Sequence, residues 1–323
     1  MSEALRPTEG DPIQLGADPR VTTRVTTPVT TRVAPRAADW FASTRRARVL
    51  HRGRHALYLE NPQRQVAGIV APAVGAGPLF VTLANDGVLP RFLRDRPGDL
   101  DTDPEGPHVT VTTRGISWLS SPEAAPPHLS IEGALDWDPR PRWTDLSSPA
   151  DLVERLSAWV CPEISRSLID PFENLTRNWL SDPSAAVRAA LQLAGRGGGL
   201  TPAGDDLLIG FALGLWAIDH PTTGQFRELQ CRVAPRTTRL SAAHLAAAAE
   251  GEAPEAWHDL VGALASSPGD LDSHRLAILN WGASSGRHTL FAFLSILAQT
   301  FDSAPPPSAS NDKSTRLSWE LSA

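Results

Sequence analysis

Hydrophobic residues recur with two different periods along the chain, and the change falls near Ser148. Over residues 48–141, short β-branched or alternating runs such as QVAGIVAP and LFVTLA are separated by Gly, Pro, Asn and Asp, which is typical of strands joined by turns. Closely spaced strands without intervening helices predict a small antiparallel sheet or barrel. Beyond Ser148 the spacing becomes helical. The sequence therefore predicts an α+β protein, with a β-rich domain at 38–148 and an α-helical domain at 149–303.

Both ends of the chain lack a pattern that could bury surface. Residues 1–37 contain VTTRVTTPVTTRVAPR, in which valine and threonine favour strands but proline recurs and no hydrophobic face closes. We therefore expect a disordered basic tail there, with a basic arm that contacts an acidic partner as the alternative. Residues 304–323 predict a second disordered tail.

Composition narrows the class of protein. A length of 323 residues fits two domains, and 41% hydrophobic with 20% charged residues is typical of a globular chain. The net charge of −6 gives no electrostatic case for a nucleic-acid partner. The longest apolar run, LLIGFALGLWAI, is twelve residues, whereas a membrane helix needs about 20. We therefore expect no membrane partner. Cys161 and Cys231 form no CxxC motif, so we expect no cysteine zinc site, and two cysteines suit a cytoplasmic protein.

The densest group of unusual residues is GRGGGLTPAGDDLLIG, residues 195–210. One helix is expected to end at Gly195, and another to begin with Thr201 as N-cap and Pro202 as first helical residue. Consecutive glycines let backbone amides turn inward, and the free N–H groups of the new helix point the same way, an arrangement that holds phosphate or carboxylate. A tight connection between two helices is the alternative. The candidate anion-binding residues here are Gly198, Gly199, Thr201 and Gly204.

Asp205 and Asp206 fall in the first turn of this expected helix. The pair could orient an amide or amine, bind a divalent cation such as Mg²⁺, or act as a base, so both are candidate catalytic residues, and the metal ligands if a metal is bound. First-turn carboxylates also favour the helix dipole by about 0.3–1 kcal/mol each, which is the structural alternative. The spacing matches neither the Walker A nor the dinucleotide motif, so the cofactor stays open.

A second stretch, NWGASSGRHTLFAFLSIL at 280–297, repeats the plan of glycine, two hydroxyl residues, glycine, two polar residues and an apolar helix. Ser284 or Ser285 would begin the helix, and Arg287 takes the place of an aspartate. An arginine in a first turn opposes the helix dipole, so an anionic ligand or a carboxylate is expected beside it. If the two loops face one cleft, the anion-binding residues also include Ser284, Ser285, Gly286 and Arg287.

Between the loops lies RTTRLSAAHLAAAAEGE. Arg236 and Arg239 precede Ser241 near a helix start, where two arginines can clamp a carboxylate or phosphate; surface charge is the alternative for either one alone. His244 on the alanine-rich helix is more often a packed histidine than a catalyst. No Ser-His-Asp order, HExxH motif or histidine cluster with metal-ligand spacing is present.

Together, GLTPAGDD, TTRLSAAHLAAAAEGE and GASSG resemble the AllH family, which includes the AllH subunit associated with the catabolic oxamate carbamoyltransferase of allantoin degradation. The resemblance covers about 185–300 well and the β-rich part only in outline. It implies carbamoyl transfer between oxalurate and phosphate, giving oxamate and carbamoyl phosphate, with companion subunits, one of them similar to acyl-CoA synthetases. The chain departs from the family at Ala203, where serine is common, and at Arg287-His288, where an aspartate commonly follows the second glycine loop.

These observations predict a subunit of an oxamate carbamoyltransferase-type enzyme that binds an anionic carbamoyl or phosphate species at glycine-rich helix N-termini. Its expected partners are a small anionic substrate and companion subunits of the same pathway. The alternative is a non-catalytic subunit that senses a ligand or assembles a multi-subunit enzyme. Whether this chain is itself catalytic is left open.

Overall fold

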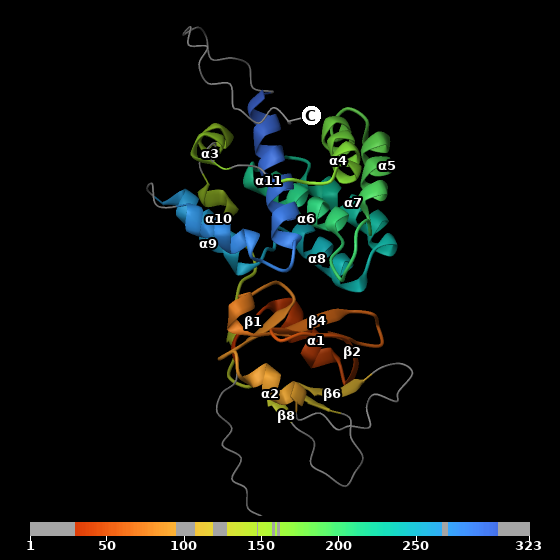
Figure 1. The fold of residues 1–323 in the computed structure, drawn as a ribbon, viewed down its shortest axis with the longest axis vertical. Helices are drawn as coiled ribbons and strands as arrows, with labels where there is room; N and C mark the ends of the chain where they lie inside the picture. Colours follow the sequence, from red (N-terminus) through yellow and green to blue (C-terminus); the bar gives the residue numbers. More distant parts are fainter. Residues whose placement is uncertain are drawn as a thin grey trace, which may run out of the picture.

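The computed structural model describes residues 30–94, 107–118, 128–146, 148–156, 159, 162–266 and 271–302. The protein has the α+β class expected from its sequence, with a sheet in the N-terminal part and helices after it (Figure 1). None of the helices in the described part of the chain is long and apolar enough to cross a membrane.

In the described part, one sheet has the strand order β8-β7-β6-β2-β3-β4-β5-β1-β9. Most neighbours pair antiparallel, but β4 with β5 and β1 with β9 are parallel, so the sheet is mixed and not the antiparallel one expected. The strands are β1 (Thr30–Val33), β2 (Arg46–Arg52), β3 (Ala56–Glu60), β4 (Val66–Val70), β5 (Phe80–Leu83), β6 (His108–Thr112), β7 (Gly115–Trp118), β8 (His128–Ser130) and β9 (Leu135–Asp136).

The two faces of the sheet pack against different parts of the protein, because successive side chains of a strand point to opposite sides. Leu57 and Leu59 of β3 lie in a core that includes Trp40 and Phe41 of α1 (Pro35–Ser43) and residues of α2 (Val88–Arg94). Tyr58, between these two leucines, packs against a different cluster that also contains residues of the helical domain. The second face of the sheet therefore meets the helices.

The N-terminal boundary of the β-rich domain lies earlier than the sequence suggested. The sequence predicts a disordered tail as far as residue 37, but Thr30–Val33 form β1, between β5 and β9, and α1 begins at Pro35. The local sequence does not identify this short threonine-valine segment as a strand, because its partners, β5 and β9, are distant in sequence. The rest of the two predicted tails, residues 1–29 and 304–323, lies outside the described residues.

The helical domain is built around α6, which is buried on nearly all sides and packs along α11. Glycine permits this close approach, since a Cβ atom at Gly210 would lie 2.1 Å from the carbonyl oxygen of Thr289. The helices are α3 (Pro149–Leu156), α4 (Arg166–Asn178), α5 (Pro183–Leu193), α6 (Ala203–Ala217), α7 (Thr223–Val233), α8 (Arg239–Ala249), α9 (Glu255–Ala265), α10 (Asp272–Leu279) and α11 (Ser285–Asp302). Short 3₁₀ turns lie at Pro72–Val74 (η1), Trp143–Asp145 (η3) and Ala234–Arg236 (η4).

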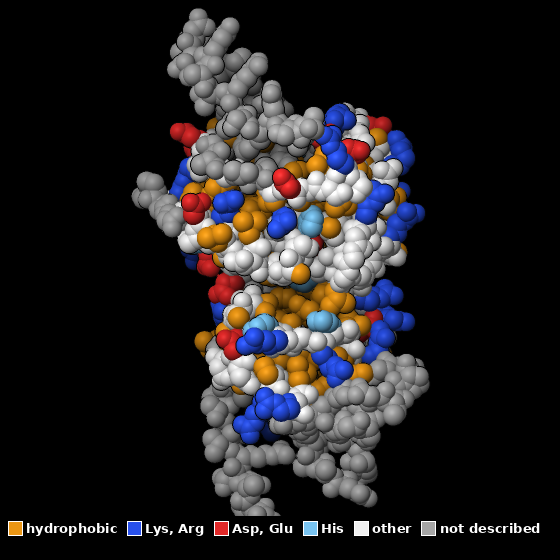
Figure 2. Space-filling view, viewed as in Figure 1, with side chains coloured by type: hydrophobic (Ala, Val, Ile, Leu, Met, Phe, Trp, Pro, Cys, Tyr) orange, Lys and Arg blue, Asp and Glu red, His pale blue; other side chains and the backbone are white. Residues whose placement is uncertain are grey.

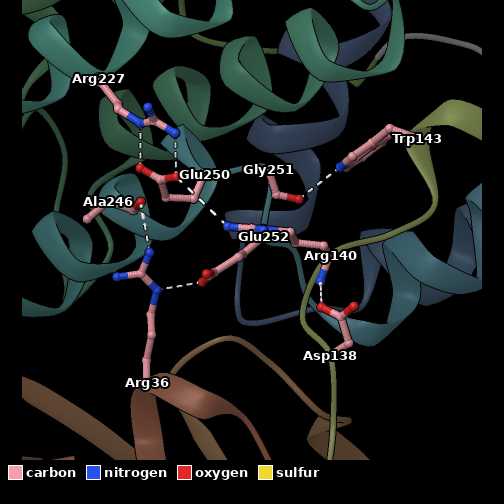
Figure 3. Close-up of polar contacts among 9 residues, drawn as sticks. All are labelled: Arg36, Asp138, Arg140, Trp143, Arg227, Ala246, Glu250, Gly251 and Glu252. Carbon is pink, nitrogen blue, oxygen red and sulfur yellow. Dashed lines mark hydrogen bonds and ion pairs between the residues drawn. The ribbon is translucent and has the colours of Figure 1, made fainter. Parts of the chain in front are cut away.

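The turn after α8, residues 250–252, connects the two domains through ion pairs. Glu252 receives a hydrogen bond of 2.5 Å from Arg36 of α1, and Glu250 is held by both Arg227, at 2.5 Å, and Arg140, at 3.9 Å (Figure 3). Beside them, the indole N–H of Trp143 donates to the carbonyl oxygen of Gly251 at 2.8 Å. The AEGE segment, residues 249–252, therefore connects the two domains, and both of its glutamates are held in ion pairs.

Candidate functional site

The three motifs that are separated in sequence meet in the structure. The hydroxyl groups of Thr201, in the first glycine loop, and Ser285, at the start of α11, are hydrogen-bonded at 2.8 Å. Thr238, the N-cap of α8, donates to the carbonyl oxygen of Leu200, and Thr237 donates to the carboxylate of Asp205. The two helix starts, α6 and α11, and the start of α8 thus surround one place at the edge of the helical domain.

The first glycine loop is shaped by close backbone approaches. Gly195 has a φ of 71°, and a Cβ atom there would lie 2.4 Å from the carbonyl oxygen of Arg236. Gly199 has a φ of 85°, and both it and Gly198 face open space. Within the described residues no hydrogen bond occupies the amides of Gly198 and Gly199. These two amides are donors available to a ligand, whereas Gly195 serves packing.

The helix start differs by one residue from the prediction, which limits its use for an anion. Pro202 is the N-cap of α6, and Thr201 caps nothing because its hydroxyl contacts Ser285. The amide of Gly204 donates to the carbonyl oxygen of Arg196 at 2.9 Å, and that of Gly286 donates to Trp281 at 3.0 Å. The amides of Gly204 and Gly286 are therefore not free for an anion, in contrast to those of Gly198 and Gly199.

Asp205 is a structural anchor of the loop. The side chain is fully buried and accepts a 2.8 Å hydrogen bond from the amide of Gly195 as well as the bond from Thr237. Burial raises the pKa of this carboxyl, and hydrogen bonds from Thr237, Gly195 and Ser241 offset that rise in part. Both oxygens are engaged, so the acid fixes the loop and the start of α8 relative to α6.

Asp206 has the opposite character. It is also fully buried, yet neither carboxyl oxygen makes a hydrogen bond of ordinary geometry among the described residues, although the Ser285 hydroxyl lies near enough to interact with it. Burial raises its pKa to about 8, the Ser285 hydroxyl lowers it in part, and the charge of Asp205 raises it further. At neutral pH the group is therefore mostly the uncharged acid, which offers one O–H donor and one carbonyl acceptor. An unsatisfied buried polar group costs stability, so it invites a functional explanation.

This protonation state predicts a specific pH dependence for Asp206→Asn. Between the unfolded pKa of 3.8 and the folded value of about 8, the folded protein binds the extra proton. The free energy of unfolding should therefore fall as pH rises through this window, by at most about 1.4 kcal/mol per pH unit. Asparagine cannot ionise, so the free energy of unfolding of the variant should rise relative to that of wild type from pH 5 to pH 8. Above pH 8 the difference between the two proteins should stay constant. Melting temperatures of both proteins from pH 5 to pH 9 test this; a constant offset throughout would contradict it.

The predicted arginines lie away from this place. Arg236 of η4 is exposed, and Arg239 extends toward the sheet, where its Nε is 3.8 Å from the Oε1 atom of buried Glu60. Arg287 is exposed on α11, about 200° around the helix from Ser285, because successive residues turn by about 100°. Arg287 therefore points away from Thr201, and the two loops meet through the hydroxyl groups of Thr201 and Ser285.

Other predicted residues are placed as follows. Ser284 is exposed, and its carbonyl oxygen accepts from the amides of Arg287 and His288, so it begins α11 with its backbone. Sequence reasoning missed Thr237 and Thr238, although a threonine three residues before Ser241 at a helix start is itself a capping signal. The described residues contain no group of three or more His, Cys, Asp or Glu side chains that could hold a metal ion. Both oxygens of Asp205 accept hydrogen bonds, so of this pair of acids only Asp206 could bind a cation such as Mg²⁺.

Two cavities lie elsewhere in the described structure. One of about 670 Å³ is lined by residues that include Trp179, Phe211 and His220, and another of about 580 Å³ by residues that include Arg140 and Trp216. Neither includes a residue of the two glycine loops. The chemistry gathered around Asp206 thus lies outside both cavities.

The fold and this arrangement define an α+β protein whose helical domain joins two glycine-containing helix starts around a buried carboxyl pair. Residues 193–297 match the family described as oxamate carbamoyltransferase subunit AllH. This match confirms the resemblance inferred from the three motifs, which all lie inside it, and supports a role as a subunit; the β-rich domain lies outside it. No curated protein matches the chain. No solved structure matches it.

Proposed function

We propose that this protein is a subunit of an oxamate carbamoyltransferase-type enzyme and binds an anionic carbamoyl compound where α6 and α11 begin. The observation that carries the proposal is Asp206, a buried carboxyl that makes no hydrogen bond of ordinary geometry and lies where the family motifs meet. Both carboxyl oxygens of its neighbour Asp205 already accept hydrogen bonds, from Gly195 and Thr237, so the two acids have separate roles.

The chemistry of Asp206 favours a carbamoyl group. The uncharged acid has one donor and one acceptor, and a carbamoyl group has N–H donors beside a carbonyl acceptor, so the two planar groups can form a pair of hydrogen bonds. The free amides of Gly198 and Gly199 would hold the negative end of the same molecule. Donors fixed in this way also stabilise the charge that develops on oxygen during acyl transfer.

A ligand-dependent melt of the full chain tests the proposal with phosphate, oxamate, oxalurate and carbamoyl phosphate. A ligand at 100 times its Kd should add about 2.7 kcal/mol of stability. Asp206→Ala should lose the response to the carbamoyl compounds, whereas Asp206→Asn, which keeps a donor and an acceptor, should retain part of it. Asp151→Asn is the matched control, because that carboxylate lies in the first turn of α3 on the surface. An unchanged response in Asp206→Ala would refute the site.

The second candidate is a non-catalytic subunit that senses a ligand or assembles the enzyme. It is favoured by the exposure of Gly197, Gly198 and Gly199, whose loop could contact a companion subunit. Incubating the purified protein alone with oxalurate and phosphate separates the two candidates. Formation of oxamate supports the catalytic role, and ligand binding without turnover supports the sensing role.

A further inference from the structure

His244 is a nearly buried histidine at the boundary between the two domains. Its side chain is on α8, three residues after Ser241 and therefore on the same side of the helix. The residue is 5% exposed, and its ring meets Phe80 of β5 edge-on at 5.8 Å and Trp281 at 5.9 Å. The imidazole thus lies between the sheet and the loop that precedes α11.

The imidazole makes no hydrogen bond within the described part of the chain. Burial lowers the pKa of His244 to about 4, so the ring is neutral at pH 7 and carries one donor and one acceptor. Buried polar groups are normally satisfied, because leaving one without a partner costs stability. Like Asp206, His244 lies in the family-matched segment, and its ring nitrogens make no hydrogen bond to the described protein, so they can bind a ligand.

The surroundings of His244 connect it to both glycine loops. Leu200 of the first loop packs against the apolar cluster formed by Val66, Val70, Leu79, Phe80 and Leu240, and Trp281 belongs to the second loop. Tyr58 of β3 continues the contact on the sheet, with its ring 6.1 Å from that of Phe80. Figure 2 shows hydrophobic side chains lining a hollow between the helical half and the sheet. An apolar lining with a few unused polar groups at a domain boundary is typical of a small-molecule site.

We propose that this hollow is the second half of the ligand site and that His244 donates a hydrogen bond to a carbonyl oxygen of the organic anion held at the glycine loop. The inference rests on the proposed function and extends it: the ligand class is a carbonyl-bearing anion, and the β-rich domain supplies one wall. Inorganic phosphate has no carbonyl oxygen and would occupy the glycine loop without contacting His244.

Calorimetric titration of the full chain with oxamate, oxalurate and phosphate tests this. His244→Ala should weaken oxamate and oxalurate binding by about 2- to 12-fold, the range for one neutral hydrogen bond, and leave phosphate affinity unchanged. His244→Asn, which keeps an N–H donor, should lose less. His274→Asn on α10 is the control. If wild type binds all three probes and His244→Ala binds them equally well, this inference is wrong and the proposed function stands; if wild type binds none of them, both fall.

A second readout does not depend on the stability of the His244 variants. Tyr58 is the single tyrosine of the chain, so protein labelled with 3-fluorotyrosine gives one fluorine resonance, from a ring beside Phe80. Oxamate and oxalurate should shift this resonance in wild type, and phosphate should not. Binding of oxamate and oxalurate by calorimetry without any shift would place them away from the hollow and overturn the inference.

Discussion

Removal of residues 30–37 should lower the melting temperature of the protein by about 10 °C or more. These residues include β1, which hydrogen-bonds to β5 on one side and to β9 on the other. Each such bond contributes about 1 kcal/mol net, and for a domain of about 150–250 residues each kcal/mol corresponds to about 2–4 °C. Without β1 the edge of β5 is uncovered, and β9 has no neighbour.

The same segment also carries the charges that join the domains. Arg32 forms a two-pronged pair with Glu255 at the start of α9, and Glu255 also accepts from the amide of Ala76 at 2.9 Å. Burial alone would raise the pKa of Glu255, but these hydrogen bonds and the charge of Arg32 bring it below its usual value. Arg36 pairs with Glu252 through a single hydrogen bond, from its Nε atom. Deleting both arginines leaves two partly buried carboxylates unpaired, which is costly.

Two truncated chains measure this effect, one lacking residues 1–29 and one lacking residues 1–37. The difference between their melting temperatures reports the contribution of residues 30–37 alone. The double variant Arg32→Ala/Arg36→Ala should show part of the loss, since it removes the ion pairs and keeps the strand. Equal melting temperatures for the two truncated chains would show that the sheet is stable without β1.

The fold class was predictable because it depends on local pattern. Helical periodicity and capping residues such as Asp182, whose side chain accepts from the amide of Ala185 at 2.9 Å, are visible in single segments. The insertion of β1 was not predictable, because it depends on contacts with strands far away in sequence. The parallel pairing of β4 with β5 was not predictable either, because the short segment between these strands does not reveal their relative direction. Residues 30–33 have the local sequence of a tail because the strands that pair with them, β5 and β9, are distant in sequence.

The sequence indicates which residues make up the candidate site, but it does not separate their structural roles. Glycine, threonine and adjacent acids marked the loop, yet sequence could not separate Asp205, whose oxygens are both engaged, from Asp206, whose oxygens are both free. The direction of Arg287 was also unpredictable, because it depends on which face of α11 packs against α6. His244 looked like an ordinary packed histidine, and only its lack of a hydrogen bond distinguishes it.

Asp205→Ala should destabilise the protein by about 2–4 kcal/mol and disorder the first glycine loop. The substitution leaves the amide of Gly195 and the hydroxyl of Thr237 without their acceptor, and a hydrogen bond to a charged group contributes about 1.5–3 kcal/mol. Water can reach part of this region, since Gly195 and Thr237 are half-buried, so the loss should stay below the sum of two such bonds. At about 2–4 °C per kcal/mol, the melting temperature should fall by about 5–15 °C.

Asp206→Asn provides the matched comparison, because it alters the adjacent acid in the same helical turn without removing an acceptor that the protein uses. Hydrogen exchange of the peptide covering residues 194–202 should accelerate in Asp205→Ala and stay at the wild-type rate in Asp206→Asn. Ligand binding should be lost in Asp205→Ala as a consequence of loop disorder, whereas in Asp206→Ala it should be lost with the loop intact. If exchange in residues 194–202 were unchanged in Asp205→Ala, the loop would be held by the bonds from Thr238 and Ser241 to Leu200, and Asp205 would not be its anchor.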